Sequence, residues 1–203
     1  MTETAPAAQP ASHWRRNRTL YLLLAVCLAP VIASYTAYYL LPPSGRTNYG
    51  TLIEPQRPLP VLALRRLDGT AVDASSLRGS WLMVQVDGGA CDAACAKKLW
   101  QMRQVRLTTG KDADRVQRLW LIVDEAPLAT SLIREYDGTV FLRASAAQAA
   151  DFLPLPAQPG ASLADHIWLI DPLGNLMMRW PKDADPSRMK KDLIKLLKAS
   201  KIG

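Results

Sequence analysis

The sequence is poor in the residues on which several protein classes depend. Its 203 residues include only three cysteines and two histidines. Three cysteines are too few for a disulfide-stapled mini-protein or for a zinc site made of four thiolates. The net charge is +7, but no lysine and arginine block is interleaved with aromatic residues, so we expect no nucleic-acid partner. A content of 49% hydrophobic and 21% charged residues excludes a disordered or collagen-like chain.

A long apolar run lies near the N-terminus. Residues 19–41 contain no charge, and about 20 such residues suffice to cross a bilayer core. The next charge after the run is Arg46, and the charges just before it are Arg15, Arg16 and Arg18. The positive-inside rule therefore predicts a cytoplasmic N-terminus. A cleaved signal peptide is the alternative, with Ala33 or Ala37 at its cleavage site, but signal cores are usually shorter, at about 7–15 residues.

We expect four segments along the chain. Residues 1–18 should form a disordered cytoplasmic tail, and residues 19–41 a transmembrane helix. Residues 42–60 carry five prolines and no apolar periodicity, which is typical of an extended tether. Residues 61–203 are long enough to bury one core and should form a single domain.

The folded segment alternates between short apolar runs and helical stretches. A β-hairpin is expected around Asp68-Gly69, within residues 61–72. Further strands are expected at 81–86, 118–123, 167–170 and 176–180, and helices at 91–107, 145–152 and 185–201. The strand–helix–strand unit obeys the right-handed crossover rule for parallel strands. This order predicts an α/β, thioredoxin-like fold with an N-terminal β-hairpin extension, preceded by one transmembrane helix.

Two cysteines lie at an expected strand-to-helix turn. Cys91 and Cys95 follow a Gly-Gly loop, and a helix N-terminus stabilises anionic sulfur. A spacing of four places both sulfurs on one helical face. Such a pair can bind a soft ion such as Cu(I) or form a reversible disulfide. A permanent disulfide or simple packing is the alternative, although a bridge across one helical turn closes almost no loop and therefore stabilises little.

Further motifs accompany the cysteine pair. They are the N-terminal anchor, Val123-Asp124 at the end of the second buried strand, and Asp165-His166 before the segment IWLIDPLG. With them the chain resembles the Sco/SenC family of membrane-anchored, thioredoxin-like copper proteins. The resemblance implies copper, as Cu(I) or Cu(II), held by Cys91, Cys95 and His166. The sequence departs from the family's CPxxCP pattern, because Asp92 and Ala96 stand where prolines are usual.

His166 is the one histidine available to the domain, since His13 lies on the other side of the predicted membrane helix. Two interpretations stay open. His166 is either the third copper ligand, oriented by Asp165, or an ordinary strand-edge histidine bonded to Asp165 or to backbone.

Three functions remain open. The first is a protein of the inner, cytoplasmic membrane whose periplasmic domain delivers copper to a cytochrome c oxidase subunit or another copper carrier, or reduces the subunit's cysteines. The second is a metal-free thiol–disulfide oxidoreductase, an enzyme in which Cys91 attacks and Cys95 resolves. The third is a non-catalytic assembly factor that uses the fold for docking. A peroxiredoxin is disfavoured, because Gly88-Gly89-Ala90 supplies no hydroxyl near the cysteine.

The last expected helix is amphipathic. Its apolar residues lie opposite its lysines, which are Lys190, Lys191, Lys195, Lys198 and Lys201. The simplest interpretation is the solvated face of a helix packed on the sheet. Attraction to anionic lipid headgroups or to an acidic partner is a second hypothesis, with each charge contributing about 1 kcal/mol near a membrane surface.

Overall fold

The N-terminal apolar run forms helix α1 (His13–Leu40), of which Asn17–Leu40 is long and apolar enough to cross a membrane. The computed structural model describes residues 13–40 and 48–203, and the chain divides into two units, Met1–Arg46 and Thr47–Gly203. Residues 13–18 are helical, although we expected them in the tail. The rest of that tail, residues 1–12, and Leu41 of the expected membrane helix lie outside the described residues.

The second unit is built on one eight-stranded sheet with the order β1-β8-β7-β4-β5-β6-β2-β3. The strands are β1 (Thr51–Pro58), β2 (Leu64–Arg65), β3 (Ala71–Val72), β4 (Trp81–Asp87), β5 (Val116–Ile122), β6 (Thr139–Arg143), β7 (Ile167–Ile170) and β8 (Asn175–Arg179). The central strands β4, β5 and β6 are parallel, whereas β7 pairs antiparallel with β4. Strands β4 and β5 form because their apolar residues are buried on both faces of the sheet.

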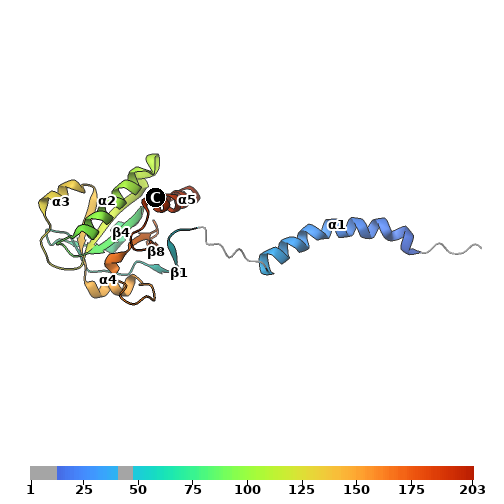
Figure 1. The fold of residues 1–203 in the computed structure, drawn as a ribbon, viewed down its shortest axis with the longest axis horizontal. Coiled ribbons are helices and arrows are strands. Elements are labelled where there is room, and N and C mark those ends of the chain that lie inside the picture. The colour runs from blue at the N-terminus through green and yellow to red at the C-terminus, as the bar shows by residue number, and fades with distance from the viewer. Residues whose placement is uncertain (1–12, 41–47) are drawn as a thin grey trace, which may run out of the picture. The chain divides into compact units, whose positions relative to one another are not determined.

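Helices cover both faces of the sheet (Figure 1). Helices α2 (Ala93–Leu107) and α5 (Pro186–Ala199) pack on one face, and α4 (Ala146–Phe152) on the other. The pleat of β4 supplies both cores, because Met83 points toward α2 and Val84 points away from it. Helix α3 (Thr130–Glu135) and three short 3₁₀ helices, η1 (Ala74–Leu77), η2 (Gly110–Arg115) and η3 (Leu163–Asp165), complete the unit. The expected thioredoxin-like α/β fold is confirmed.

The tether expected over residues 42–60 is wrong at its C-terminal end. Residues Thr51–Pro58 form β1, which pairs antiparallel with β8 at the edge of the sheet. An edge strand tolerates proline, because one of its sides needs no backbone donor. The folded unit thus begins before residue 61 and includes β1. Its first turn is fixed by Asp192, whose carboxylate accepts hydrogen bonds from the backbone N–H groups of Tyr49 and Gly50.

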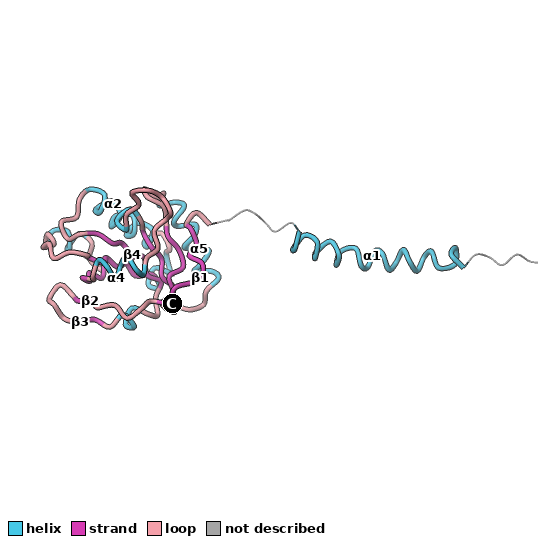
Figure 2. Tube along the Cα trace, turned by 90° about the horizontal axis from the view of Figure 1, so that it is seen from below, coloured by secondary structure: helices cyan, strands magenta, loops and turns pink. Residues whose placement is uncertain are grey.

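The expected N-terminal hairpin is present as β2 and β3, which form a ribbon at the far edge of the sheet from β1 (Figure 2). Its turn contains Gly69 at φ +86°, a conformation that glycine adopts without strain. The helix expected to begin at Cys91 begins two residues later, because Asp92 is its N-cap and accepts from the Cys95 N–H. Strand β6 and helix α3 were not expected from the sequence.

Candidate functional site

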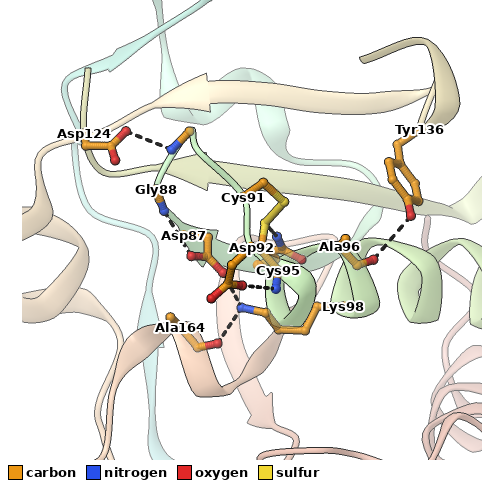
Figure 3. The surroundings of a disulfide bond; sticks show 12 residues. Asp87, Gly88, Cys91, Asp92, Cys95, Ala96, Lys98, Asp124, Tyr136 and Ala164 are labelled. Atoms are coloured by element: carbon orange, nitrogen blue, oxygen red, sulfur yellow. Dashed lines mark hydrogen bonds and ion pairs between the residues drawn. A yellow bond between two sulfur atoms is a disulfide. The ribbon is translucent and has the colours of Figure 1, made fainter. Parts of the chain in front are cut away.

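Cys91 lies in the loop that leaves the buried strand β4, and Cys95 lies in the first turn of α2, which that loop enters (Figure 3). This loop can follow its path only because it begins with two glycines. A Cβ on Gly89 would overlap the carbonyl of Ala126. The Gly89 N–H also donates to the Asp124 carboxylate, at 2.8 Å, so the end of β5 holds the loop in place. Asp124 therefore acts as a capping group for two turns, since it accepts from the Ala126 N–H as well.

Cys91 and Cys95 form a disulfide whose Cα atoms lie 5.2 Å apart. The two residues differ in access to solvent. Cys95 is fully buried among the side chains of the α2-face core, whereas Cys91 is half-buried at the surface of the loop. Cys91 also has φ +41°, the left-handed region that costs a non-glycine residue about 1–2 kcal/mol. Of the two cysteines, only Cys91 is therefore partly open to solvent.

A buried amide contacts the inner sulfur. Gln85 on β4 is fully buried, and its Nε2 donates to the Cys95 Sγ at 3.1 Å. Its Oε1 atom has no hydrogen-bond partner among the described residues. A donor aimed at sulfur stabilises the thiolate that forms when the disulfide opens, because a hydrogen bond to a charged acceptor is stronger than one to a neutral acceptor.

An ion pair lies one helical turn beyond Cys95. Lys98 Nζ is 2.7 Å from Asp87 Oδ2, and it also donates to the Ala164 carbonyl (Figure 3). The side chains are only 10% and 19% exposed, so both charges are largely removed from water. The pair joins α2 to the end of β4, and the Ala164 contact adds η3. These bonds fix the helix that carries Cys95.

His166 lies just before β7, where Ile167 pairs with Gln85. Ile167 belongs to the same core as Cys95, so the preceding side chain points to the other face of the sheet. There the imidazole packs edge-on against Trp168, with ring centroids 5.7 Å apart. The sheet thus separates His166 from the Cys95 sulfur.

The hydrogen bonds of His166 define its tautomer. Its Nδ1 lies 2.9 Å from the Trp180 carbonyl oxygen, which can only accept, so Nδ1 carries the proton. Nε2 is buried without a partner among the described residues. Asp165 does not orient the ring, contrary to one of our two interpretations. Its carboxylate bonds instead to Lys182, at 2.9 Å, and this contact lowers the pKa of the Asp165 carboxyl.

The described residues contain no group of three or more His, Cys, Asp or Glu side chains arranged to hold a metal ion. The structure brings Cys91 and Cys95 together and does not bring His166 to them. The role of His166 as a third copper ligand therefore remains an expectation that rests on the family resemblance alone. Two sulfurs without an imidazole suit Cu(I), which prefers thiolates, better than Cu(II).

Sequence reasoning missed Gln85, Asp87 and Lys98 as parts of the site. A signal existed for two of them. Gln85 is the one polar residue within the buried run WLMVQV, and its alternation with Met83 places it on the α2 face. Lys98 follows Cys95 by three residues, which puts both on one face of the helix. The pairing of Lys98 with Asp87 could not be read from spacing, since it depends on how α2 crosses β4.

The fold and the site together define a thioredoxin-like protein with a cysteine pair at the helix entrance. The profile of a family described as the transmembrane-like, thioredoxin-like, C-terminal domain matches residues 81–200, and the chain belongs to this family. The apolar helix and this family together support a single-pass membrane anchor. No curated protein sequence matches the chain.

Several solved structures share the fold. The copper-bound ScoI of Arabidopsis thaliana is 16% identical, with a TM-score of 0.54, over 71% of this chain and 99% of that one. The apo Sco1 of Thermus thermophilus is 18% identical, with a TM-score of 0.54, over 77% and 98%. A thiol:disulfide interchange protein from a Bacteroides species is 14% identical, with a TM-score of 0.50, over 72% and 91%. The expected resemblance to Sco proteins is thus confirmed at the level of the fold.

Replacing Gln85 by methionine should make the disulfide harder to reduce. The substitution removes the donor to Cys95 Sγ and keeps a side chain of similar size. Loss of a bond to a charged sulfur, of about 1.5 kcal/mol, corresponds to a reduction potential lower by about 30 mV. Equilibration with a dithiol buffer measures the change. Gln101→Met is the control. Gln101, on α2, is buried like Gln85, but its side chain donates to the Ala184 carbonyl instead of a sulfur. Equal potentials in the two variants would contradict the role of Gln85.

His166 should make the stability of the domain depend on pH. Burial lowers the pKa of His166 in the folded protein, so below about pH 6.5 the unfolded chain binds more protons than the folded one. The free energy of unfolding should therefore fall as the pH drops from 7.5 to 5.5, by at most about 1.4 kcal/mol per pH unit from this group. Urea unfolding of wild type and His166→Gln at both pH values isolates the effect.

Proposed function

We propose that this protein is a membrane-anchored thiol–disulfide oxidoreductase whose Cys91–Cys95 pair exchanges disulfides with a partner protein. The observation that carries the proposal is the unequal burial of the two bridged cysteines at the entrance of α2. The half-buried Cys91 can form a mixed disulfide, and the fully buried Cys95 can resolve it. The arginines before the apolar run support a periplasmic domain, on the side where disulfide exchange is available.

The reaction needs only the two sulfurs and a partner disulfide. In the reducing direction the Cys91 thiolate attacks one sulfur of the partner disulfide, and the other partner sulfur leaves as a thiolate that takes a proton from water. The Cys95 thiolate then attacks Cys91 Sγ, which forms the intramolecular disulfide and releases the second partner thiolate. Two electrons pass from the pair to the partner, and a dithiol donor must reduce the pair again.

The surroundings assign different tasks to the groups near the pair. Gln85 donates to the sulfur of Cys95 and stabilises it as a thiolate before it attacks. Asp92 bonds to the Cys95 N–H and fixes the first turn of α2. The Sco/SenC resemblance supports the copper-binding cysteines of a cytochrome c oxidase subunit as the partner, because those cysteines must be reduced before they accept metal.

Carriage of Cu(I) is a second candidate function of the same pair. The observation in its favour is that the two sulfurs are adjacent at the start of α2, and the similar ScoI of Arabidopsis thaliana has copper bound. Once reduced, Cys91 and Cys95 offer two soft ligands to copper as cargo. Cu(II) would require a further ligand, for which His166 is the candidate from the resemblance.

Anaerobic assays of the full-length protein in nanodiscs separate these functions. A Cys27→Ser background removes the exposed third thiol on α1. Reduction of a disulfide peptide at least tenfold faster than by a free dithiol, lost in Cys91→Ser, is expected for the oxidoreductase. Reaction no faster than that of the free dithiol would overturn it. Binding of one Cu(I), lost in Cys91→Ser/Cys95→Ser and retained in His166→Ala, is expected for the carrier.

A third experiment tests whether the protein is instead a non-catalytic assembly factor that acts by docking. In cells that lack the native protein, the Cys91→Ser/Cys95→Ser variant should fail to support oxidase assembly if either cysteine function holds. Full oxidase assembly with this variant would favour a non-catalytic assembly factor.

A further inference from the structure

The exposed side of α5 carries charge of one sign. We define the α5 basic face as Lys191, Lys195, Lys198 and Lys201, all of which are exposed. Within α5, spacings of three and four residues place the first three of them in one stripe. The opposite side of the helix, with Leu193 and Leu197, is buried on the sheet.

The acidic residues in α5 and at its start are held by other groups. The one acidic residue within α5, Asp192, is 2% exposed and accepts from the Trp180 Nε1 as well as from two backbone N–H groups. Two aspartates flank the start of the helix. Asp183 pairs with Lys97 at 2.7 Å, and Asp185 is the N-cap that accepts from the Ser187 N–H. Both flanking carboxylates thus have partners, and both lie at the opposite end of α5 from Lys198.

The chain enters the folded unit on this same helix. The N–H groups of Tyr49 and Gly50 donate to Asp192 at 3.0 and 2.8 Å. The Arg188 guanidinium lies over the Tyr49 ring, 3.9 Å from its centroid, and the Tyr49 hydroxyl accepts from the Asp185 N–H. In the sequence only residues 41–47 separate this fixed segment from Leu40, the last residue of the candidate membrane span.

We propose that the α5 basic face binds the anionic phospholipid headgroups of the membrane that holds α1. Attraction of exposed lysines to an anionic surface falls off within about a Debye length, roughly 8 Å at physiological salt, so it acts only on a helix kept near that surface. Because the chain that comes from α1 is attached to α5, we expect α5 to meet the membrane surface more readily than the other elements of the domain do. Binding would limit the orientations from which the domain meets its partner.

A fluorescent probe on α5 tests the proposal in the full-length protein. The probe is attached to Ala199→Cys, an exposed position, in the Cys27→Ser background with the native disulfide closed. Nanodiscs contain headgroup spin-labelled lipid as quencher, in phosphatidylcholine alone or with 30% phosphatidylglycerol. We expect at least twofold stronger quenching in the anionic discs at low salt, and its loss in 0.5 M NaCl.

Two charge variants with equal net charge provide the decisive comparison. Lys191→Glu/Lys198→Glu/Lys201→Glu should remove the extra quenching, whereas the control, whose three substitutions lie on other elements, should keep it. The control substitutions are Arg66→Glu, Lys111→Glu and Arg134→Glu, all at exposed positions. Equal quenching in neutral and anionic discs would overturn the proposal. An acidic protein would then be the better candidate partner of the α5 basic face. Equal loss in both variants would also overturn the proposal, since net charge alone would then explain the attraction.

Discussion

Cys95→Ser is expected to abolish turnover in disulfide exchange and to leave Cys91 joined to its partner through a stable mixed disulfide. In the wild type, the resolving Cys95 is held next to Cys91, with Cα atoms 5.2 Å apart. Such proximity corresponds to effective concentrations of about 10⁵ M or more in well-oriented reactions. Resolution by an external thiol at millimolar concentration cannot replace it, so turnover should fall at least about 100-fold.

The reciprocal variant should behave differently. In Cys91→Ser the remaining sulfur is Cys95, which is fully buried and out of reach of a partner disulfide. Both variants should thus lose turnover, but only Cys95→Ser should accumulate the adduct. Mass spectrometry after incubation with a disulfide-containing peptide measures the adducts, in the Cys27→Ser background. Adducts on Cys95 in the Cys91→Ser variant would contradict the assigned order of attack.

The sequence predicted the centre of the fold better than its edges. The run WLMVQV and the run RLWLIV are apolar enough to be buried on both faces, and they became the parallel strands β4 and β5. Strand β1 escaped prediction because Pro55 and Pro58 suggested a tether. Its formation depends on contacts that are remote in sequence, namely the pairing with β8 and the bonds from Tyr49 and Gly50 to Asp192.

In the candidate site, too, local features could be predicted from the sequence and contacts between remote segments could not. The cysteines could be found from their spacing and their place after a buried strand, which are local features. The position of His166 could not, because its side of the sheet depends on the register between β7 and β4. One residue of difference in that register would move the imidazole to the other face. A likeness of motif order to the Sco family therefore reproduces the fold without fixing the ligand set.

The second large effect concerns the stability of the helix that carries Cys95. Asp87→Leu should lower the free energy of unfolding by about 3–5 kcal/mol, because it leaves the buried Lys98 ammonium without its counter-ion. The Ala164 carbonyl stays in contact with Lys98, but a neutral acceptor does not balance a desolvated charge. Denaturant unfolding of the full-length protein in detergent, followed by tryptophan fluorescence, measures the loss.

A double variant distinguishes an unpaired charge from general damage to the loop. In Asp87→Leu/Lys98→Met both charges are gone, and apolar replacement of a buried ion pair is often neutral or stabilising, so the free energy of unfolding should return to within about 1 kcal/mol of wild type. Lys97→Met is the control, since the Lys97–Asp183 pair is 2.7 Å apart but its side chains are 54% and 67% exposed. Its cost should stay below about 1 kcal/mol. Failure of the double variant to recover would show that Asp87 supports the loop by its bond to the Gly88 N–H instead, and that the ion pair contributes little to holding α2 against β4.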